Sequence, residues 1–459
     1  MNKRFYTVTS VVLAFMLMLG GCGLNDAPTI SDVTEARSEQ TTVSERASES
    51  EILSEPFIPT EITEETTTPE ATEATVLETT VAETIVFPVT ETTTTAAETA
   101  PFTEKTTVSV SLAPSSGSKP SLEEITRPYP YRFLTEKEKQ IYDIFEGAAV
   151  SLSNKADFAE MSVTKSELEN AVYAFDLYEP LYSYISLKDC VIHSKNGYVQ
   201  YIDMAYYYDK SSHQKMTEAV RSVADKILAK ITPDMTEYDV VKLLHDEIVR
   251  NCVYDETAQN RNFAYGALVD GRATCTGYAK AFNYLCNRAG IENTCAFGMA
   301  GGEGHMWNMV KLDGEWYEVD TTWDDTSSDG FEGFIYYDYF LVTTASMGDR
   351  ELFAYNIEKP VATGTKYNYY TMTSTYAEDE ATLEAAMYNC LKIAAENNEK
   401  YAQFKYKDSS VLSMIEEFAQ SGRMINIIKR VENDTGYVFN KSEMKYYTSN
   451  NDTIVVISI

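Results

Sequence analysis

Apolar residues recur every three to four positions in two adjacent segments near the middle of the chain, which is the spacing of one buried helix face. Residues 237–251 place Leu244 and Ile248 on such a face, and residues 211–231 show a similar pattern. Thr-x-x-Glu sequences are capping boxes that begin helices, and they occur at two earlier positions, Thr135 and Thr164. The pattern therefore predicts helices at residues 211–231 and 237–251, and short helices after Thr135 and Thr164.

Strand-like runs, rich in β-branched and aromatic residues, occur on both sides of the two helices predicted at residues 211–251. Residues 189–208 contain Asn196-Gly197 between two such runs, and this turn signal predicts a hairpin. Beyond residue 360, strand-like and helical runs alternate. The elements expected there are strands at 366–376, 402–406 and 453–459, a helix at 381–396, and two short helices before the last strand. We interpret residues 360–459 as a small α/β domain without a recognisable chemical motif.

The first 22 residues follow another pattern. Lys3 and Arg4 precede an apolar run at residues 11–19, which is too short to span a bilayer and is typical of a secretory signal. The run ends in the letters LGGC, which resemble the lipobox of bacterial lipoproteins. That resemblance implies lipid attachment to Cys22 and a protein anchored on the extracellular face of a bacterial cell membrane. The alternative is an ordinary cleaved signal with an unrelated cysteine.

Residues 23–127 differ from the rest of the chain in composition. Up to residue 120 they hold 23 threonines and 8 of the 13 prolines, with 18 acidic residues against 4 basic ones. Such a sequence cannot bury enough apolar surface to offset its chain entropy, so we predict a disordered, extended stalk. Folded protein is expected from Pro128 onward, where 32 of the 33 tyrosines lie, with a first folded region at residues 128–350.

The chain as a whole is strongly acidic, with a formal net charge of −32. This excess argues against nucleic acid or anionic lipid as binding partners. The six cysteines after Cys22 include no CxxC pair, and no histidine lies at ligand spacing from them, so no metal site is predicted. They can form three disulfides only if none of them must remain a free thiolate.

The segment GRATCTGYAKAF places Cys275 at the predicted start of a helix, because Ala279, Phe282 and Leu285 follow it at helical spacing. At a helix N-terminus, unpaired N–H groups and the helix dipole stabilise an anion and lower the pKa of a thiol. The resulting thiolate is a strong nucleophile. A small buried core residue is the commoner role of a cysteine, so Cys275 taken alone does not define a site.

All three tryptophans and one of the four histidines lie within residues 303–325. The letters DG in this segment predict a two-residue hairpin turn. With that turn, His305 lies opposite Thr322 and Asp320 lies opposite Trp307, so these four residues share one face of the hairpin. His305 and Asp320 are then diagonal neighbours whose side chains can meet.

An aspartate that orients an imidazole, which in turn faces a thiol, is the nucleophile–base–orienter arrangement of acyl transfer. We therefore predict Cys275, His305 and Asp320 as catalytic residues. We expect the side chains of Trp307, Tyr278 and Asn308 to form walls of the substrate site. The other two tryptophans fit a plain core role equally well.

The motifs GRATCTGYAKAF, GHMWNMV and WYEVDTTWDD resemble, in this order, those of the transglutaminase-like superfamily, over roughly residues 215–345. The resemblance implies a papain-like α+β fold, in which a helix bearing Cys275 packs on an antiparallel sheet bearing His305 and Asp320. It also implies a thioester intermediate, which an amine resolves in crosslinking and water resolves in proteolysis or deamidation. No Gln or Trp immediately precedes Cys275, so the oxyanion donor stays open, with the Cys275 backbone N–H as one candidate.

We therefore expect a surface-anchored thiol enzyme, a cysteine protease or a protein-glutamine acyltransferase, acting on extracellular protein or peptide amides. The alternative is a non-catalytic binding or scaffold lipoprotein that keeps the fold; a wall-peptide hydrolase is a third, although no peptidoglycan-binding module is evident. No cofactor is expected. Many animal relatives need calcium, but Tyr336 stands where a calcium loop beginning at Asp325 has its glutamate. The sequence leaves the oligomeric state open.

Overall fold

The computed structural model describes residues 6–7, 81–84 and 125–459, apart from 182–183, 328–330, 332, 349, 353–358, 442–443 and 450–452. Cys22 and nearly all of the predicted signal and stalk lie outside these residues, so lipidation and disorder stay predictions. Within those segments, only the short strands β1 (Tyr6–Thr7) and β2 (Val81–Thr84) are described, each at the edge of a sheet formed by later residues. None of the helices in the described part of the chain has the length and apolar character needed to cross a membrane.

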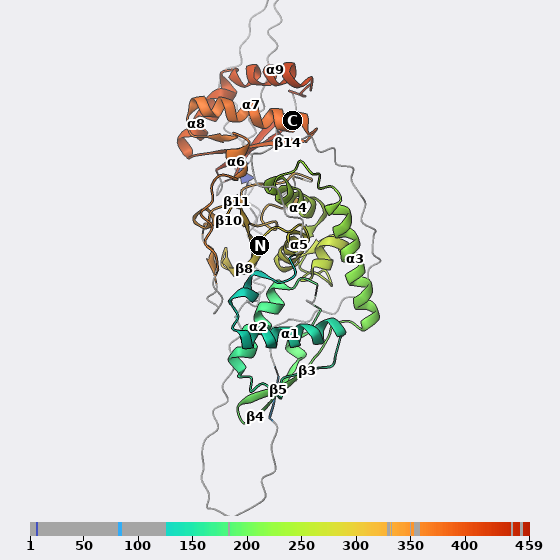
Figure 1. The fold of residues 1–459 in the computed structure, drawn as a ribbon. Coiled ribbons are helices and arrows are strands. Elements are labelled where there is room, and N and C mark those ends of the chain that lie inside the picture. Colours follow the sequence, from blue (N-terminus) through green and yellow to red (C-terminus); the bar gives the residue numbers. More distant parts are fainter. Residues whose placement is uncertain are drawn as a thin grey trace, which may run out of the picture.

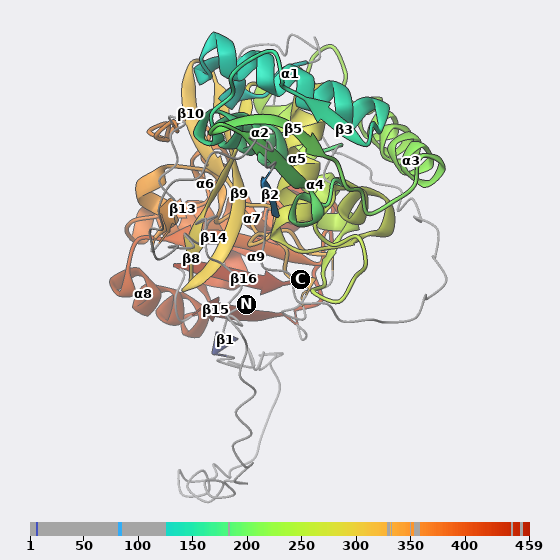
Figure 2. The same cartoon turned by 90° about the horizontal axis from the view of Figure 1, so that it is seen from below.

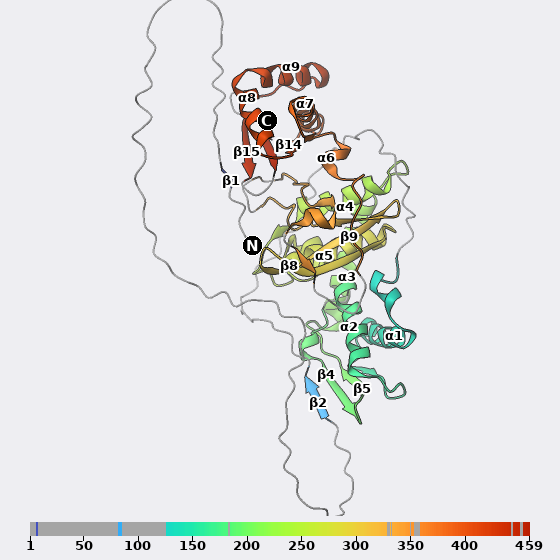
Figure 3. The same cartoon turned by 90° about the vertical axis from the view of Figure 1, so that its left-hand side faces the viewer.

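The described residues form an α+β protein whose three parts lie one after another along its long axis (Figures 1 and 3). The N-terminal domain has its own buried core, in which Phe145, Phe175 and Ile202 are nearly inaccessible to solvent. Figure 2 looks at the molecule from the side of this domain. Its elements are η1 (Tyr129–Phe133), α1 (Glu136–Ser151), β3 (Lys155–Asp157), α2 (Lys165–Tyr178), η2 (Leu187–Asp189), β4 (Val191–Lys195) and β5 (Tyr198–Asp203).

The local signals read from the sequence are confirmed in this domain. The capping boxes at Thr135 and Thr164 both form, with each threonine side chain accepting the backbone N–H of the glutamate three residues later. Asn196 and Gly197 have positive φ angles of 54° and 78° and join β4 to β5 as a hairpin. Strands β2, β4, β5 and β3 lie in this order in one sheet.

The middle domain consists of helices against a five-stranded antiparallel sheet of order β11-β10-β9-β8-β12. Helix α5 packs on β8 and β9, and its residues Ala279, Phe282 and Leu285 are almost fully buried. The elements are α3 (Lys210–Leu228), α4 (Glu237–Asn251), β6 (Val253–Tyr254), η3 (Gly266–Asp270), β7 (Arg272–Ala273), α5 (Cys275–Arg288), β8 (Asn293–Ala300), β9 (Glu303–Leu312), β10 (Glu315–Val319), β11 (Phe340–Val342), η5 (Thr344–Met347) and β12 (Glu351–Leu352).

The C-terminal domain is a sheet of order β1-β15-β16-β14-β13 with helices packed on it, and β13 and β14 run parallel. Its own buried cluster begins at Ala377. The elements that follow the middle domain are α6 (Tyr369–Met372), β13 (Tyr376–Ala377), α7 (Glu380–Glu396), β14 (Tyr401–Tyr406), α8 (Ser409–Gln420), α9 (Arg423–Thr435), β15 (Lys445–Ser449) and β16 (Ile454–Ser458).

The prediction of a strand at residues 366–376 is wrong. Asn368 begins the short helix α6 there, because its side chain accepts the backbone N–H of Tyr370 at 3.1 Å. Tyr369 and Tyr370 are buried in the core of the middle domain. The two adjacent aromatic side chains are therefore buried by a helical turn rather than by a strand.

The C-terminal domain and the middle domain share buried residues. Ile454 and Val456 of β16 belong to the core cluster of the middle domain. The Gln403 side-chain amide donates to the Ile335 carbonyl at 2.7 Å and accepts from the Tyr370 hydroxyl at 2.9 Å. The two domains therefore meet through a packed interface with satisfied polar groups.

Candidate active site

Cys275 is the first residue of α5, as the sequence predicts. Thr274, the cap residue, is extended, and it is held by a loop: its backbone N–H donates to the Arg261 carbonyl at 2.9 Å and its hydroxyl donates to Asn262 at 2.6 Å. Gly277 lets this loop approach the helix, since a Cβ there would lie 2.3 Å from the Arg261 carbonyl oxygen. The loop at residues 261–262 therefore fixes the position of the helix start that carries the Cys275 thiol.

The hairpin of β9 and β10 has the predicted register, which pairs Leu312 with Glu315. Pairing stops at Val319, however, so Asp320 and Thr322 are not part of the ladder. The predicted cross-strand positions of these two residues are therefore wrong, although the strand that precedes them is correctly placed.

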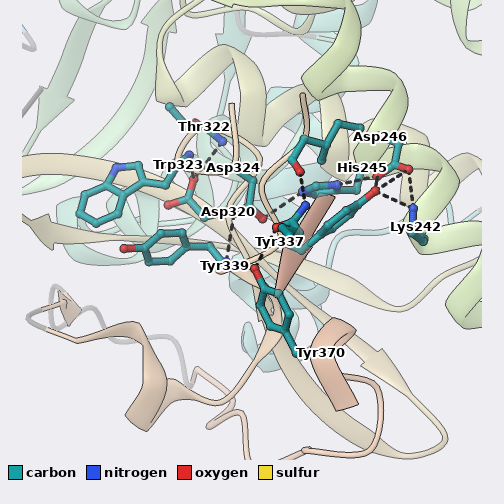
Figure 4. Close-up of polar contacts among 12 residues, drawn as sticks. Lys242, His245, Asp246, Asp320, Thr322, Trp323, Asp324, Tyr337, Tyr339 and Tyr370 are labelled. Carbon is teal, nitrogen blue, oxygen red and sulfur yellow. Dashed lines mark hydrogen bonds and ion pairs between the residues drawn. The ribbon is translucent and has the colours of Figure 1, made fainter. Parts of the chain in front are cut away.

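The chain leaves the strand at Asp320 because this side chain builds a turn. Its Oδ1 accepts the backbone N–H groups of Thr322 and Trp323 at 3.0 and 3.1 Å. The Asp320 N–H donates to the Tyr339 carbonyl at 3.0 Å, and the Asp324 N–H donates to the Asp320 carbonyl at 3.1 Å. One carboxylate oxygen is thus committed to the backbone, and Oδ2 is left for other partners (Figure 4).

Oδ2 of Asp320 lies 2.7 Å from Nε2 of His305, and both residues are buried. This contact leaves Nδ1 of His305 as the ring nitrogen that can exchange a proton with the Cys275 thiol, because His305 and Cys275 also interact with each other. The structure therefore brings together Cys275, His305 and Asp320, the three residues that the sequence predicts as catalytic.

The electrostatics of these residues favour a charged pair. Burial by itself lowers the pKa of His305, but the charge and hydrogen bond of Asp320 outweigh it and raise that pKa to about 9. Burial raises the pKa of the Cys275 thiol, but the hydrogen bond and charge of His305 outweigh it, so the net pKa is lowered. Both shifts favour a thiolate facing an imidazolium over a neutral thiol facing a neutral imidazole.

Arg350 is a third partner of the aspartate, and sequence analysis missed it. Its Nη2 lies 2.6 Å from Oδ2 of Asp320, and its side chain is only 2% exposed. Burial raises the pKa of Asp320, but Arg350 and then His305 hold it well below the usual range. Arg350 lies in an irregular segment before β12, where neither periodicity nor a motif marks it.

Trp307 is the one predicted wall residue that lies beside the site. Its ring stacks near that of His305, with centroids 5.8 Å apart and planes 18° apart, and its Nε1 donates to the buried Glu318 at 2.7 Å. Tyr278 and Asn308, by contrast, are fully buried in the core.

The polar groups of Tyr278 and Asn308 form hydrogen bonds with residues other than Cys275. The Tyr278 hydroxyl donates to Asp325 at 2.7 Å, and the Asn308 amide donates to the Ala279 carbonyl at 3.0 Å. Their placement does not support the prediction that they are walls of a substrate site.

A second buried histidine lies behind the same turn (Figure 4). His245 of α4 is 0% exposed, and its two ring nitrogens lie 3.1 Å from Asp246 and 3.1 Å from Asp324. Lys242 and Tyr337 hydrogen-bond to Asp246 in turn. Both ring nitrogens of this mid-helix histidine are therefore satisfied.

The remaining cysteines offer no competing nucleophile. The six cysteines in the described part of the chain are all unpaired, and the net pKa of each one except Cys275 is raised, mainly by burial. The described residues contain no group of three or more His, Cys, Asp or Glu side chains arranged to hold a metal ion.

Comparison with known proteins assigns the middle domain. A family model described as the transglutaminase-like superfamily matches residues 221–321, which include Cys275, His305 and Asp320. The kyphoscoliosis peptidases of Mus musculus and Homo sapiens are each 26% identical over 176 residues, a match that covers 30% of this chain and 26% of each relative. The match thus spans about a quarter of the length of these relatives.

Two solved structures are similar to parts of the chain. One is a TGase, with 14% identity and a TM-score of 0.22 over 37% of this chain and 51% of that one. The other is the periplasmic domain of TgpA from Pseudomonas aeruginosa, with 17% identity and a TM-score of 0.19 over 30% of this chain and 62% of that one. On the strength of the family match, this chain contains a domain of the transglutaminase-like superfamily.

Proposed function

We propose that this protein is a thiol enzyme that cleaves protein or peptide amides, with Cys275 as nucleophile, His305 as acid and base, and Asp320 as the residue that orients His305. The observation that carries the proposal is the arrangement of the three groups: a thiol on the first residue of a helix interacts with an imidazole, and that imidazole lies 2.7 Å from a buried carboxylate. Such an arrangement is typical of nucleophilic catalysis.

The chemistry follows from these positions. The Cys275 thiolate attacks the amide carbon, and the negative oxygen that forms lies within reach of the first N–H groups of α5, which have no partner inside the helix. The C–N bond then breaks as His305 gives its proton to the leaving amine, and a thioester stays on the sulfur. His305, now neutral, takes a proton from the incoming water, the water oxygen replaces the sulfur, and the thiolate is restored.

Water is our preferred acceptor of the acyl group, which makes the protein a cysteine protease. The curated relatives carry the name peptidase, and this supports hydrolysis over amine transfer. An amine in place of water gives a protein-glutamine acyltransferase instead. Lipid anchoring through Cys22 would restrict either activity to substrates outside the cell.

An alkylation experiment tests the nucleophile without any knowledge of the substrate. Iodoacetamide at neutral pH is expected to modify Cys275 at least about tenfold faster than the other five cysteines of the described residues, because among these six thiols only that of Cys275 has a lowered pKa. Cys390, buried and with a raised pKa, is the matched control residue. Equal labelling of the six cysteines in the folded protein would contradict the proposal.

A second experiment identifies the acceptor. The protein and its Cys275→Ala variant are incubated with a peptide library and a labelled primary amine, and the products are read by mass spectrometry. Shortened peptides that depend on Cys275 support the protease, and incorporated amine supports the acyltransferase. Neither product, with Cys275 rapidly alkylated, would point to a domain that keeps the site for binding.

A further inference from the structure

Arg350 occupies an unusual position for a buried cation. Apart from its ion pair with Asp320, it is surrounded by aromatic rings: its guanidinium carbon lies 4.4 Å from the ring centroid of Trp323, 4.8 Å from that of Trp307 and 5.1 Å from that of Tyr339. Cation–π contacts of this kind compensate for part of the lost hydration of a guanidinium. The rings also limit the directions in which the side chain can point.

Arg350 and His305 approach the same oxygen. Nη2 of Arg350 lies 2.6 Å from Oδ2 of Asp320, and Nε2 of His305 lies 2.7 Å from it. Because Oδ1 is occupied by backbone N–H groups, this oxygen is the only part of the carboxylate shared between the two cations. The negative charge of the Asp320 carboxylate is therefore shared between His305 and Arg350.

The other titratable groups around this cluster are few. Glu318 is buried and accepts hydrogen bonds from Trp307 and Thr344, each at 2.7 Å; burial raises its pKa, and the charge of Arg350 partly opposes this. Tyr254 interacts electrostatically with Cys275, and burial raises its pKa above the usual value. Lys359, whose pKa burial lowers to about 8, interacts with Glu318 rather than with Cys275 or His305. The charges that act directly on the Cys275–His305 pair are thus mainly those of Asp320 and, through it, Arg350.

We propose that Arg350 is a positioning residue for this site: it holds Asp320 ionised and aimed at His305, and its charge sets the pH range over which Cys275 and His305 form an ion pair. This inference rests on the proposed function. A negative aspartate alone disfavours the thiolate and favours the imidazolium, and a neighbouring positive charge opposes both effects. Removing that positive charge therefore moves the whole ion-pair range to higher pH.

The test is the rate of Cys275 alkylation by iodoacetamide as a function of pH in the full chain. Arg350→Gln removes the charge but keeps an N–H donor for Asp320. We expect the midpoint of its acidic limb to rise by about one pH unit. Arg350→Lys keeps the charge, and its midpoint is expected to stay close to that of the wild type.

Arg430→Gln is the matched control. Arg430 also pairs with a carboxylate, Glu384 at 3.0 Å, and also lies over a ring, that of Tyr388 at 4.7 Å, but it belongs to the C-terminal domain. Its substitution should leave the midpoint unchanged. A role for Arg350 in packing alone would lower stability or the alkylation rate without moving the midpoint, and an unmoved midpoint in folded Arg350→Gln overturns the inference.

A double-mutant cycle keeps the inference testable if Arg350→Gln fails to fold. Asp320→Asn and Asp320→Asn/Arg350→Gln differ only by the arginine charge, and the double variant leaves no unpaired buried carboxylate at this point. The acidic midpoint should be higher in the double variant than in Asp320→Asn. Equal midpoints contradict the role of Arg350, whereas slow alkylation of Cys275 in the wild type contradicts the proposed function itself.

Discussion

The middle domain contains two buried histidine–aspartate pairs built on one short turn, and they differ in what faces the second ring nitrogen. His305 contacts Asp320 on one side and a thiol on the other. His245 contacts Asp324 on one side and Asp246 on the other. An imidazole between a carboxylate and a thiol can move a proton to a reacting group, whereas an imidazole between two carboxylates has its positive charge stabilised from both sides.

The second pair serves the first through the backbone. Asp324 accepts the N–H of Tyr339 at 3.0 Å, and the carbonyl of Tyr339 accepts the N–H of Asp320 at 3.0 Å. His245, held on α4, therefore anchors the turn from which the Asp320 carboxylate projects. Of these two chemically similar pairs, one therefore faces the thiol of the proposed reaction, and the other fixes the position of the turn.

The largest expected effect comes from removing His305, the histidine that faces the thiol. His305→Ala should reduce the Cys275-dependent cleavage rate by about 10³–10⁴-fold, because the thiol loses both its proton acceptor and the charge that stabilises its anion. The measurement is cleavage of a peptide identified in the library experiment. A variant that retains more than about a tenth of the rate would show that His305 does not act as the base.

Substitution of His245 should affect the stability of the fold rather than the reactivity of Cys275. His245→Asn leaves Asp246 and Asp324 buried with less compensation, and breaking a buried charge pair in this way costs about 3–5 kcal/mol of unfolding free energy. Urea denaturation measures this loss. In the folded fraction, the pH midpoint of Cys275 alkylation should stay unchanged. A shift of that midpoint would show that His245 also affects the reactivity of Cys275.

The pH dependence of stability sharpens the same contrast. Burial lowers the pKa of His245, but Asp246 and Asp324 outweigh it, so the pKa is raised in the folded protein. The stabilisation that results is fully present below the unfolded-state pKa, about 6.5, and is lost as the pH rises through the folded-state pKa.

The difference in unfolding free energy between the wild type and His245→Asn should therefore shrink above pH 6.5, by at most about 1.4 kcal/mol per pH unit. His305 is present in both proteins, so its own titration cancels from the difference. A difference that grows with pH would mean that His245 is neutral in the folded state.

The smallest expected effect concerns an exposed pair of the same type. His193 lies 2.8 Å from Asp203, whose side chain is 55% exposed, and its ring stacks on Tyr201 with centroids 4.2 Å apart. Ion pairs in contact with solvent contribute about 0–1 kcal/mol. His193→Ala should therefore change the urea midpoint only slightly, and a loss comparable with that of His245→Asn would show that burial does not govern these pairs.

Features set by neighbouring residues could be predicted from the sequence. The helix start at Cys275 and the register of the β9–β10 hairpin follow from local spacing and one turn signal, and the structure confirms both. Strand alternation also places Asn308 on the face opposite His305 and Trp307, and the structure buries it in the core, where its amide donates to the Ala279 carbonyl.

Features set by distant contacts could not be predicted in this way. His245 meets Asp324 across 79 positions, and Arg350 reaches Asp320 from an irregular segment beyond β11. Asp320 itself forms a turn rather than extending the strand, because two backbone N–H groups compete for its side chain. Such contacts depend on how separate elements pack, which local patterns do not encode.

The side chains of Ile454 and Val456, which enter the core of the middle domain, have a consequence for how the molecule is organised. An appended module joined through a flexible tether can be cut away or exchanged without harm to its neighbour. Here, excision of β16 would remove two buried apolar side chains from the core of the middle domain and open the apolar surface that they cover to water. The C-terminal domain is therefore a structural complement of the site-bearing domain, and the two should melt in a single cooperative transition.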